Sequence, residues 1–151
     1  MPIATKSDVI DLSSENKTEE LANKILKKLK TGDVIFLYGE MGVGKTTFVK
    51  YLINGYQNEN KLSLTEVTSP TFNLLNEYYI NQNKINHYDL FRLKSSEEVK
   101  NLDLFVDASN TITLIEWPQI IEEKPKNLIE LIFKYENDHN GRSVQIKGLD
   151  L

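Results

Sequence analysis

The sequence predicts a mixed α/β domain with parallel strands at the centre of its sheet and antiparallel hairpins at the edges. Two apolar runs, DVIFLYG (33–39) and TITLIEW (111–117), are continuous rather than alternating, which is typical of strands buried on both faces. Helical spacing of apolar residues around the first run, and turn signals between later β-rich runs, supply the remaining elements. With 151 residues, the chain is expected to form one domain over 1–151.

In the N-terminal half, we expect two helices, one before and one after the first strand in the sequence. Thr18 is a suitable N-cap, and apolar residues then recur at helical spacing until Gly32 supplies a stop signal. The segment GKTTFVKYLINGY (44–56) predicts a second helix that closes at Gly55. The next stretch, 57–71, is polar and contains a proline, so we expect it to be irregular.

In the C-terminal half, turn signals indicate two hairpins. Segment 72–93 holds two β-rich runs around NQNK, and the strong turn signal Asn140-Gly141 lies between the last two runs of the chain. Between the hairpins, the segment SSEEVKNLDLF predicts a short helix that begins after Ser95 or Ser96.

The composition argues against several classes of protein. The net charge is −4 and the sequence pI is about 5.3, whereas a stand-alone nucleic-acid binder usually has a basic face and a much higher pI. The chain has no cysteine, which excludes disulfides and thiolate metal sites. No apolar stretch approaches the roughly 18 residues that cross a bilayer. The start, MPIATKSDVIDLSSENK, lacks the apolar core of a secretory signal. We therefore expect a cytoplasmic protein without a membrane partner.

The strongest motif runs from Gly39 to Thr46 (GEMGVGKT) and fits the pattern G-x-x-x-x-G-K-[ST] without a gap. A buried strand precedes it and a helix follows, which is the setting of a phosphate-binding loop. Missing side chains let successive N–H groups surround phosphate oxygens, and the start of the helix adds its positive end. The Rossmann alternative fails because it requires G-x-G-x-x-G. The motif predicts a three-layer domain like that of P-loop NTPases, which holds a nucleoside triphosphate together with Mg²⁺.

Positions in this loop have separate expected roles. Lys45 would reach the β- and γ-phosphates, the Thr46 hydroxyl would ligate Mg²⁺, and Thr47 would offer a donor near the α-phosphate. The residues expected to contact the nucleotide are Glu40, Met41, Gly42, Val43, Gly44, Lys45, Thr46 and Thr47.

A phosphate loop of this kind needs a carboxylate to complete its metal site, and two acids have the right setting. Glu116 ends the apolar run TITLIE, and Asp89 ends the run KINHYD in the same way. An ordinary strand-end acid facing water is the alternative for each, but the loop motif favours a role at the metal. His87 is expected to be a strand residue with a hydrogen bond rather than a ligand. Trp117 either flanks the nucleotide or anchors the strand end.

Four motifs together resemble the TsaE family, also called YjeE. They are GEMGVGKTTFVK at 39–50, SPTF at 69–72, HYDLFRL at 87–93 and IEW at 115–117, in order and at family-like spacing over nearly the whole chain. Members of this family are small bacterial P-loop ATPases needed to make threonylcarbamoyladenosine in tRNA. The resemblance implies an ATPase subunit that acts with the TsaB and TsaD proteins and meets tRNA only through that complex.

The resemblance also implies roles for matching residues. Thr71, in SPTF, matches a threonine in a switch-like loop near the γ-phosphate, while Asp89 and Glu116 match the family's two acids near the metal. The expected catalytic residues are Lys45, Thr71, Asp89 and Glu116, and the expected metal ligands are Thr46, Asp89 and Glu116. The sequence departs from the family at Phe91, which replaces a common tyrosine, and at Gln119, where many members carry an acid.

Two other functions are compatible with the loop. A small-molecule P-loop kinase would use several arginines to clamp phosphates, and this chain has only Arg92 and Arg142. A nucleotide-dependent binding module without turnover would not need the two acids. Because Lys45 is the only cation that the motif supplies, we expect the isolated protein to hydrolyse ATP slowly and a partner to complete the site.

Overall fold

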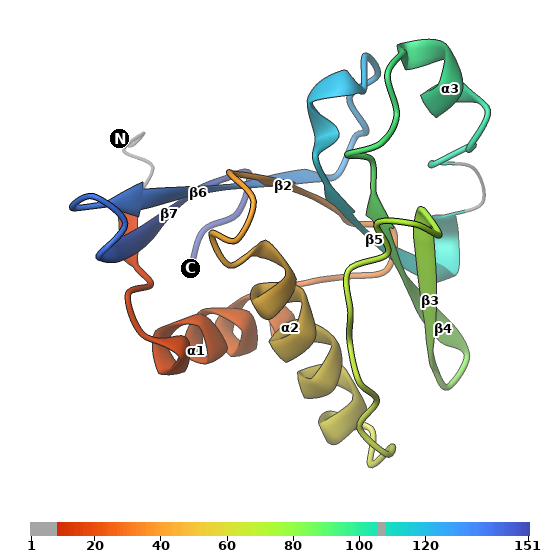
Figure 1. Ribbon diagram of the computed structural model, residues 1–151. Coiled ribbons are helices and arrows are strands. Elements are labelled where there is room, and N and C mark those ends of the chain that lie inside the picture. Colours follow the sequence, from red (N-terminus) through yellow and green to blue (C-terminus); the bar gives the residue numbers. More distant parts are fainter. Residues whose placement is uncertain (1–8, 106–107) are drawn as a thin grey trace.

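The computed structural model describes residues 9–105 and 108–151, in which seven strands form one sheet of order β1-β7-β6-β2-β5-β4-β3 (Figure 1). The four central strands, β6, β2, β5 and β4, are paired in parallel, and the outer pairs β3/β4, β6/β7 and β1/β7 are antiparallel. The predicted parallel core with antiparallel edges is therefore confirmed. The strands are β1 (Val9–Asp11), β2 (Val34–Tyr38), β3 (Leu75–Ile80), β4 (Asn83–Asp89), β5 (Thr111–Glu116), β6 (Leu128–Glu136) and β7 (Gly141–Lys147).

The two continuous apolar runs form β2, the middle strand of the sheet, and its neighbour β5. All six residues of β5 are buried, as are the first four of β2. Along β2, Ile35 and Leu37 pack into the core on one face of the sheet, while Val34 and Phe36 pack into a second core on the other. Because both faces are covered, successive residues are all apolar, which explains why the runs do not alternate.

Both expected hairpins form. Two residues, 81 and 82, join β3 to β4, and four residues, 137–140, join β6 to β7. In the second turn, Asn137, Asp138 and His139 all have positive φ, at 50°, 52° and 74°. Asn and Asp are the non-glycine residues that tolerate this left-handed region best, so the sequence suits the turn.

Helices and loops cover the two faces of the sheet and give the predicted three layers. Helices α1 (Glu15–Leu26) and α2 (Lys45–Glu59) lie on one face and pack against each other (Figure 1). The other face carries the short helix α3 (Ser96–Lys100) and the 3₁₀ turn η3 (Pro118–Ile120), whose residues Val99 and Ile120 pack in the second core. Another 3₁₀ turn, η2 (Ala108–Asn110), directly precedes β5. No helix in the described part of the chain is both long and apolar enough to cross a membrane.

Helix ends are where the sequence predictions were wrong. Helix α1 is capped by Ser14, whose side chain accepts a hydrogen bond from Lys17 N, and Thr18 is buried inside the helix instead of capping it. This helix also ends at Leu26, before Gly32. Helix α2 does not end at Gly55 but continues to Glu59. Gly55 lies against α1, where a Cβ would be 3.3 Å from Asn23 Oδ1. The glycine serves close helix packing rather than helix termination. The short helix after Ser95 is confirmed, with Ser95 as its cap.

Candidate nucleotide site

The glycine loop lies at the carboxyl edge of the parallel strands. It follows β2 directly and leads into α2. On the neighbouring strands, Glu116 is paired with Leu37 of β2, and Asp89 is paired with Glu116. The last residues of three adjacent parallel strands therefore meet beside the loop. This edge is where ligands bind in open α/β sheets.

The loop backbone has positive φ at each of its three glycines, Gly39, Gly42 and Gly44. Gly39 has φ = 147°, and a Cβ there would be 2.8 Å from Val43 Cγ1 and 3.0 Å from the Phe133 carbonyl oxygen. Gly44 has φ = 119° and is the N-cap of α2, with no side chain capping the helix. The first backbone N–H groups of α2 thus have no side-chain acceptor at this end, and such groups bind anions.

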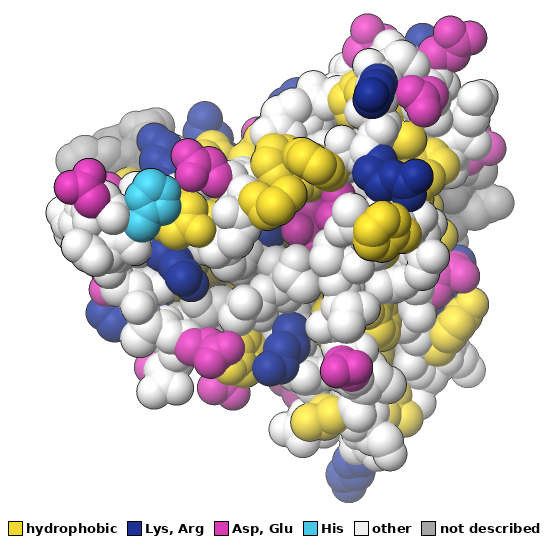
Figure 2. All heavy atoms as spheres, in the orientation of Figure 1, with side chains coloured by type: hydrophobic (Ala, Val, Ile, Leu, Met, Phe, Trp, Pro, Cys, Tyr) yellow, Lys and Arg dark blue, Asp and Glu magenta, His cyan; other side chains and the backbone are white. Residues whose placement is uncertain are grey.

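A cavity of about 390 Å³ opens over the loop. In the space-filling view, hydrophobic side chains flank a recess on the face drawn, and acidic side chains are visible inside it (Figure 2). The predicted site residues that line it are Met41, Gly42, Gly44, Lys45, Thr46, Thr47, Thr71, Asp89 and Glu116. Two predicted contacts lie elsewhere: Val43 is buried in the core at 1% exposure, and Glu40 lies next to the β6–β7 turn, with its carboxylate 3.8 Å from His139 Nε2.

Lys45 is held inside the cavity wall. Its side chain is almost fully buried, its Nζ donates to the Gly39 carbonyl oxygen, and the same nitrogen lies 3.6 Å from the centroid of the Trp117 ring. Burial lowers the pKa of the Lys45 ammonium, and the carboxylates of Glu116 and Asp89 partly oppose that shift. A cation so poorly hydrated gains strongly from an anionic ligand.

Glu116 connects the loop to the sheet. It is buried, and both of its carboxylate oxygens accept hydrogen bonds from Thr46 Oγ1, at 3.2 and 3.1 Å. Its Oε2 also lies 2.6 Å from His87 Nε2. The expectation that His87 is a hydrogen-bonded strand residue is confirmed. Its Nδ1 is buried without a partner, so we assign the proton to Nε2, where the carboxylate accepts it.

Asp89 organises a different segment, the SPTF loop. Its Oδ2 accepts from Ser69 Oγ at 2.8 Å and from Thr71 Oγ1 at 3.3 Å, and its Oδ1 accepts from Phe91 N at 2.9 Å. Ser69 and Thr71 are also hydrogen-bonded to each other at 3.0 Å. The two acids are therefore distinguished by their contacts: Glu116 bonds Thr46 at the end of the glycine motif, and Asp89 holds the loop that carries Thr71.

The donors present suit magnesium. In the described residues, no group of three His, Cys, Asp or Glu side chains is placed to hold a metal ion. Thr46 and Glu116 offer hydroxyl and carboxylate oxygens within hydrogen-bonding distance of each other. Mg²⁺ takes oxygen ligands, keeps several waters, and is usually held by one or two carboxylates together with substrate phosphates. The residues therefore fit a nucleotide-bound magnesium ion.

Sequence reasoning missed Arg142 as a cavity residue. It lies in β7, and its Nη1 would be 3.9 Å from a Cβ placed on Gly44. Only the strand order would have placed Arg142 near the loop, because β7 lies next to β6, and β6 is paired with β2, the strand that precedes the loop. Arg92, by contrast, donates to the Phe72 carbonyl oxygen at 3.0 Å and does not line the cavity.

Trp117 also lines the cavity, in contact with both Lys45 and Phe91. The centroids of the Trp117 and Phe91 rings are 4.9 Å apart. The backbone of Trp117 is left-handed, with φ = 59°, which is unfavourable for a bulky residue. Such conformations cluster at functional sites. Trp117 thus contacts the glycine-loop lysine and follows the end of β5, and its place beside a nucleotide stays a prediction.

Comparisons with known proteins agree with this arrangement. Residues 12–144 match the family model "Threonylcarbamoyl adenosine biosynthesis protein TsaE". Relatives named tRNA threonylcarbamoyladenosine biosynthesis protein TsaE include one from Rickettsia bellii, 41% identical over 84% of this chain and 86% of the relative. Another, from Borreliella burgdorferi, is 35% identical over 93% of this chain and 99% of the relative. The match to the Rickettsia conorii relative, 41% identical over 74% of this chain, spans only 61% of that protein.

A solved structure supports the fold. The crystal structure of Bacillus subtilis YdiB superposes with a TM-score of 0.70, covering 96% of this chain and 87% of that one at 23% sequence identity. At this identity, the likeness bears on the fold alone.

Proposed function

The chain belongs to the TsaE family, and we propose that it binds and hydrolyses ATP, with Mg²⁺, in the synthesis of threonylcarbamoyladenosine in tRNA. One observation carries the proposal: the glycine loop, a buried lysine and two buried acids converge on one cavity at the carboxyl edge of the parallel strands. The pathway, tRNA modification, is inferred from the names of the relatives, and nucleotide binding is inferred from the residues that line the cavity.

The phosphate loop provides the binding contacts in this proposal. The N–H groups at the start of α2 and the Lys45 ammonium would hold the phosphate oxygens, and Thr46 with Glu116 would hold Mg²⁺. The ion's chemical contribution is to neutralise charge on the β- and γ-phosphates. Lys45 must exchange its contacts with the Gly39 carbonyl and the Trp117 ring for contacts with phosphate.

The two acids take different roles. Glu116 is bonded to Thr46, so it is the carboxylate nearest to the proposed metal. Asp89 uses both of its oxygens to fix Ser69, Thr71 and the backbone at Phe91. We assign to Asp89 the positioning of Thr71 beside the γ-phosphate, because that hydroxyl is held within the same cavity.

Turnover should depend on partners. A positioned arginine speeds phosphoryl transfer by roughly 10³ to 10⁵, and Arg142 lies across the loop from the acids, on the β7 side. The family resemblance implies TsaB and TsaD as the partners that complete the site. The acidic chain, with net charge −4, neutralises few tRNA phosphates, so tRNA is reached through the complex, in the cytoplasm.

The test is ATP hydrolysis by the full chain, alone and with the purified TsaB–TsaD pair, under single-turnover and steady-state conditions. We expect slow hydrolysis alone and a clear increase with the pair. Turnover near 10 per second by the isolated chain, unchanged by the pair, would contradict partner dependence. No single-turnover hydrolysis even with the pair would indicate a binding module. Transfer of phosphate to an acceptor from a panel of small molecules would indicate a kinase.

A further inference from the structure

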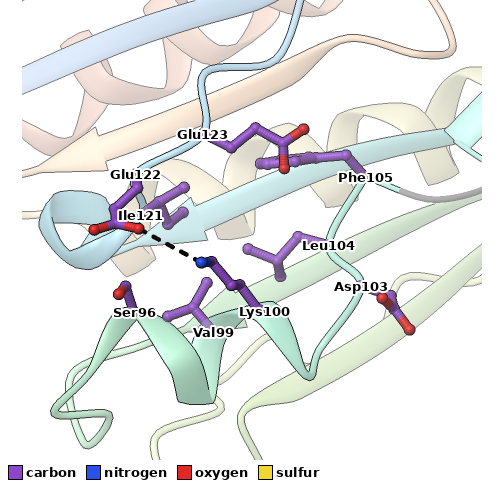
Figure 3. Close-up of a pocket in the computed structure, with 9 residues that line it drawn as sticks. All are labelled: Ser96, Val99, Lys100, Asp103, Leu104, Phe105, Ile121, Glu122 and Glu123. Atoms are coloured by element: carbon purple, nitrogen blue, oxygen red, sulfur yellow. Dashed lines mark ion pairs between the residues drawn. The ribbon is translucent and has the colours of Figure 1, made fainter.

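A second pocket lies away from the nucleotide cavity and shares no lining residue with it. It has a volume of about 420 Å³ and lies between α3 and the segment that follows η3. Its apolar lining is formed by Val99, Leu104, Phe105 and Ile121 (Figure 3). Val99 and Leu104 belong to the core on this face of the sheet, whereas Phe105 and Ile121 are only partly buried. The apolar surface thus continues from the core to the outside.

Acidic side chains surround this apolar lining. Asp103, Glu122 and Glu123 are exposed at the pocket, and Lys100 is the one basic residue among the described lining residues. Lys100 Nζ lies 3.8 Å from Glu122 Oε1, across the space between α3 and the segment after η3 (Figure 3). Both side chains are about 70% exposed, at 73% and 69%, so this pair is weak and easily opened. The rim therefore carries an excess of negative charge.

We propose that this pocket docks a partner protein through a segment that inserts one apolar side chain and places lysine or arginine on either side of it. The apolar lining accommodates the inserted side chain, and the three carboxylates attract the flanking cations. An acidic segment would be repelled. A second copy of this chain is a poor occupant, because the chain itself carries a net charge of −4. A small metabolite is disfavoured because the pocket's charged groups stand exposed at its rim instead of converging inside.

The pocket is joined to the nucleotide site through both of its walls. The α3 wall begins shortly after Phe91, and the other wall begins shortly after Trp117. The rings of Phe91 and Trp117 are in contact with each other and line the nucleotide cavity. A partner docked here would contact segments that continue from these two aromatic residues. Docking itself requires neither ATP nor hydrolysis, so its test is independent of the proposed activity.

The experiment uses methyl and backbone NMR of the full chain with three blocked peptides: Gly-Lys-Leu-Lys-Gly, Gly-Glu-Leu-Glu-Gly and Gly-Lys-Ser-Lys-Gly. At millimolar concentration, we expect the first peptide to shift the methyl resonances of Val99, Leu104 and Ile121. The acidic peptide and the serine peptide should shift them far less. Equal shifts from all three peptides, or none from the first, would overturn the proposal.

Charge reversal provides the matched comparison. The double variant Glu122→Lys/Glu123→Lys should bind the Lys-Leu-Lys peptide about fivefold more weakly or worse and should gain affinity for the acidic peptide. The control Glu19→Lys/Glu20→Lys changes the net charge equally on exposed positions of α1 and should leave peptide binding unchanged. If the control weakens binding as much as the pocket variant, the attraction is non-specific. If the methyl resonances of the pocket change with protein concentration in the absence of any peptide, a second copy of the chain is the occupant. Either outcome, non-specific attraction or a second copy, refutes the proposal.

Discussion

Replacing His87 with leucine should weaken both the fold and the response of nucleotide binding to Mg²⁺. His87 is fully buried, and its Nε2 is 2.6 Å from Glu116 Oε2. Thr46 is the other side chain that bonds this carboxylate. Leucine has a similar volume, so the variant removes the donor and leaves only a small cavity. Glutamine can place its amide nitrogen near the position of Nε2 and should restore much of the function.

The size of the effect follows from burial. A hydrogen bond to a charged group contributes about 1.5–3 kcal/mol, and a buried carboxylate left without it also keeps its desolvation cost. We therefore expect His87→Leu to lower the free energy of unfolding by about 2–3 kcal/mol. Groups that orient a metal ligand typically change metal affinity by about 10- to 100-fold. The increase in ADP affinity caused by Mg²⁺ should fall by a factor in that range.

Urea unfolding and calorimetric titration of ADP, with and without Mg²⁺, measure the two effects separately. Affinity without Mg²⁺ should change little in both variants, because the loop N–H groups and Lys45 are untouched. A His87→Leu protein that keeps the full Mg²⁺ response would refute the reasoning. So would a folded His87→Gln protein that loses the response as completely as the leucine variant.

Four other changes test the site and the fold. Lys45→Ala should abolish tight ATP binding without loss of stability, because burial already disfavours the ammonium; near-wild-type affinity in calorimetry would sink the phosphate-loop assignment. Glu116→Gln keeps the shape and should spare folding while reducing Mg²⁺-dependent hydrolysis at least about tenfold, and unchanged hydrolysis would move that role to another acid. Arg142→Met should weaken ADP and ATP by the same factor, about tenfold, since Arg142 lies across the loop from the acids; a loss confined to ATP would contradict this placement. Finally, the Lys17 hydrogen bond lowers the pKa of Asp11 from 3.8 to about 2. This stabilising contribution is complete above the ordinary pKa and is lost as the pH falls toward 2, so Asp11→Asn should lower the thermal midpoint slightly at neutral pH and not near pH 2.

Features encoded in one contiguous segment could be predicted from the sequence. The strands β2 and β5 are buried on both faces, and their apolar runs need no knowledge of their neighbours to be recognised. The glycine loop depends on spacing alone, since Gly39 and Gly44 adopt backbone conformations that side chains disfavour. The acids Asp89 and Glu116 were found because each ends such a run.

Features that depend on distant segments could not be predicted. Gly55 resembles a helix stop, but it lies in the middle of α2 because α1 packs closely against it. Arg142 follows a turn by two residues, and nothing near it in sequence indicates a cavity. Its position depends on β7 lying beside β6 and β6 beside β2. The different contacts of the two acids have the same origin, since Thr46, in the first turn of α2, bonds Glu116, whereas Ser69, in the SPTF loop, bonds Asp89.

The order and register of the strands place acidic and basic residues on opposite sides of the cavity. Leu37, Glu116 and Asp89 are paired across β2, β5 and β4, so both acids lie on one side of the loop. Arg142 comes from β7, on the other side. In the proposed function, Thr46 and Glu116 would hold Mg²⁺ next to the terminal phosphates, so the γ-phosphate would lie at the acid end and the α-phosphate end would be left for Arg142. Among the described lining residues, Lys45 is then the one cation at the end where the proposed hydrolysis would occur. A partner that brings a guanidinium to that end would raise turnover, whereas Arg142 would act mainly on affinity.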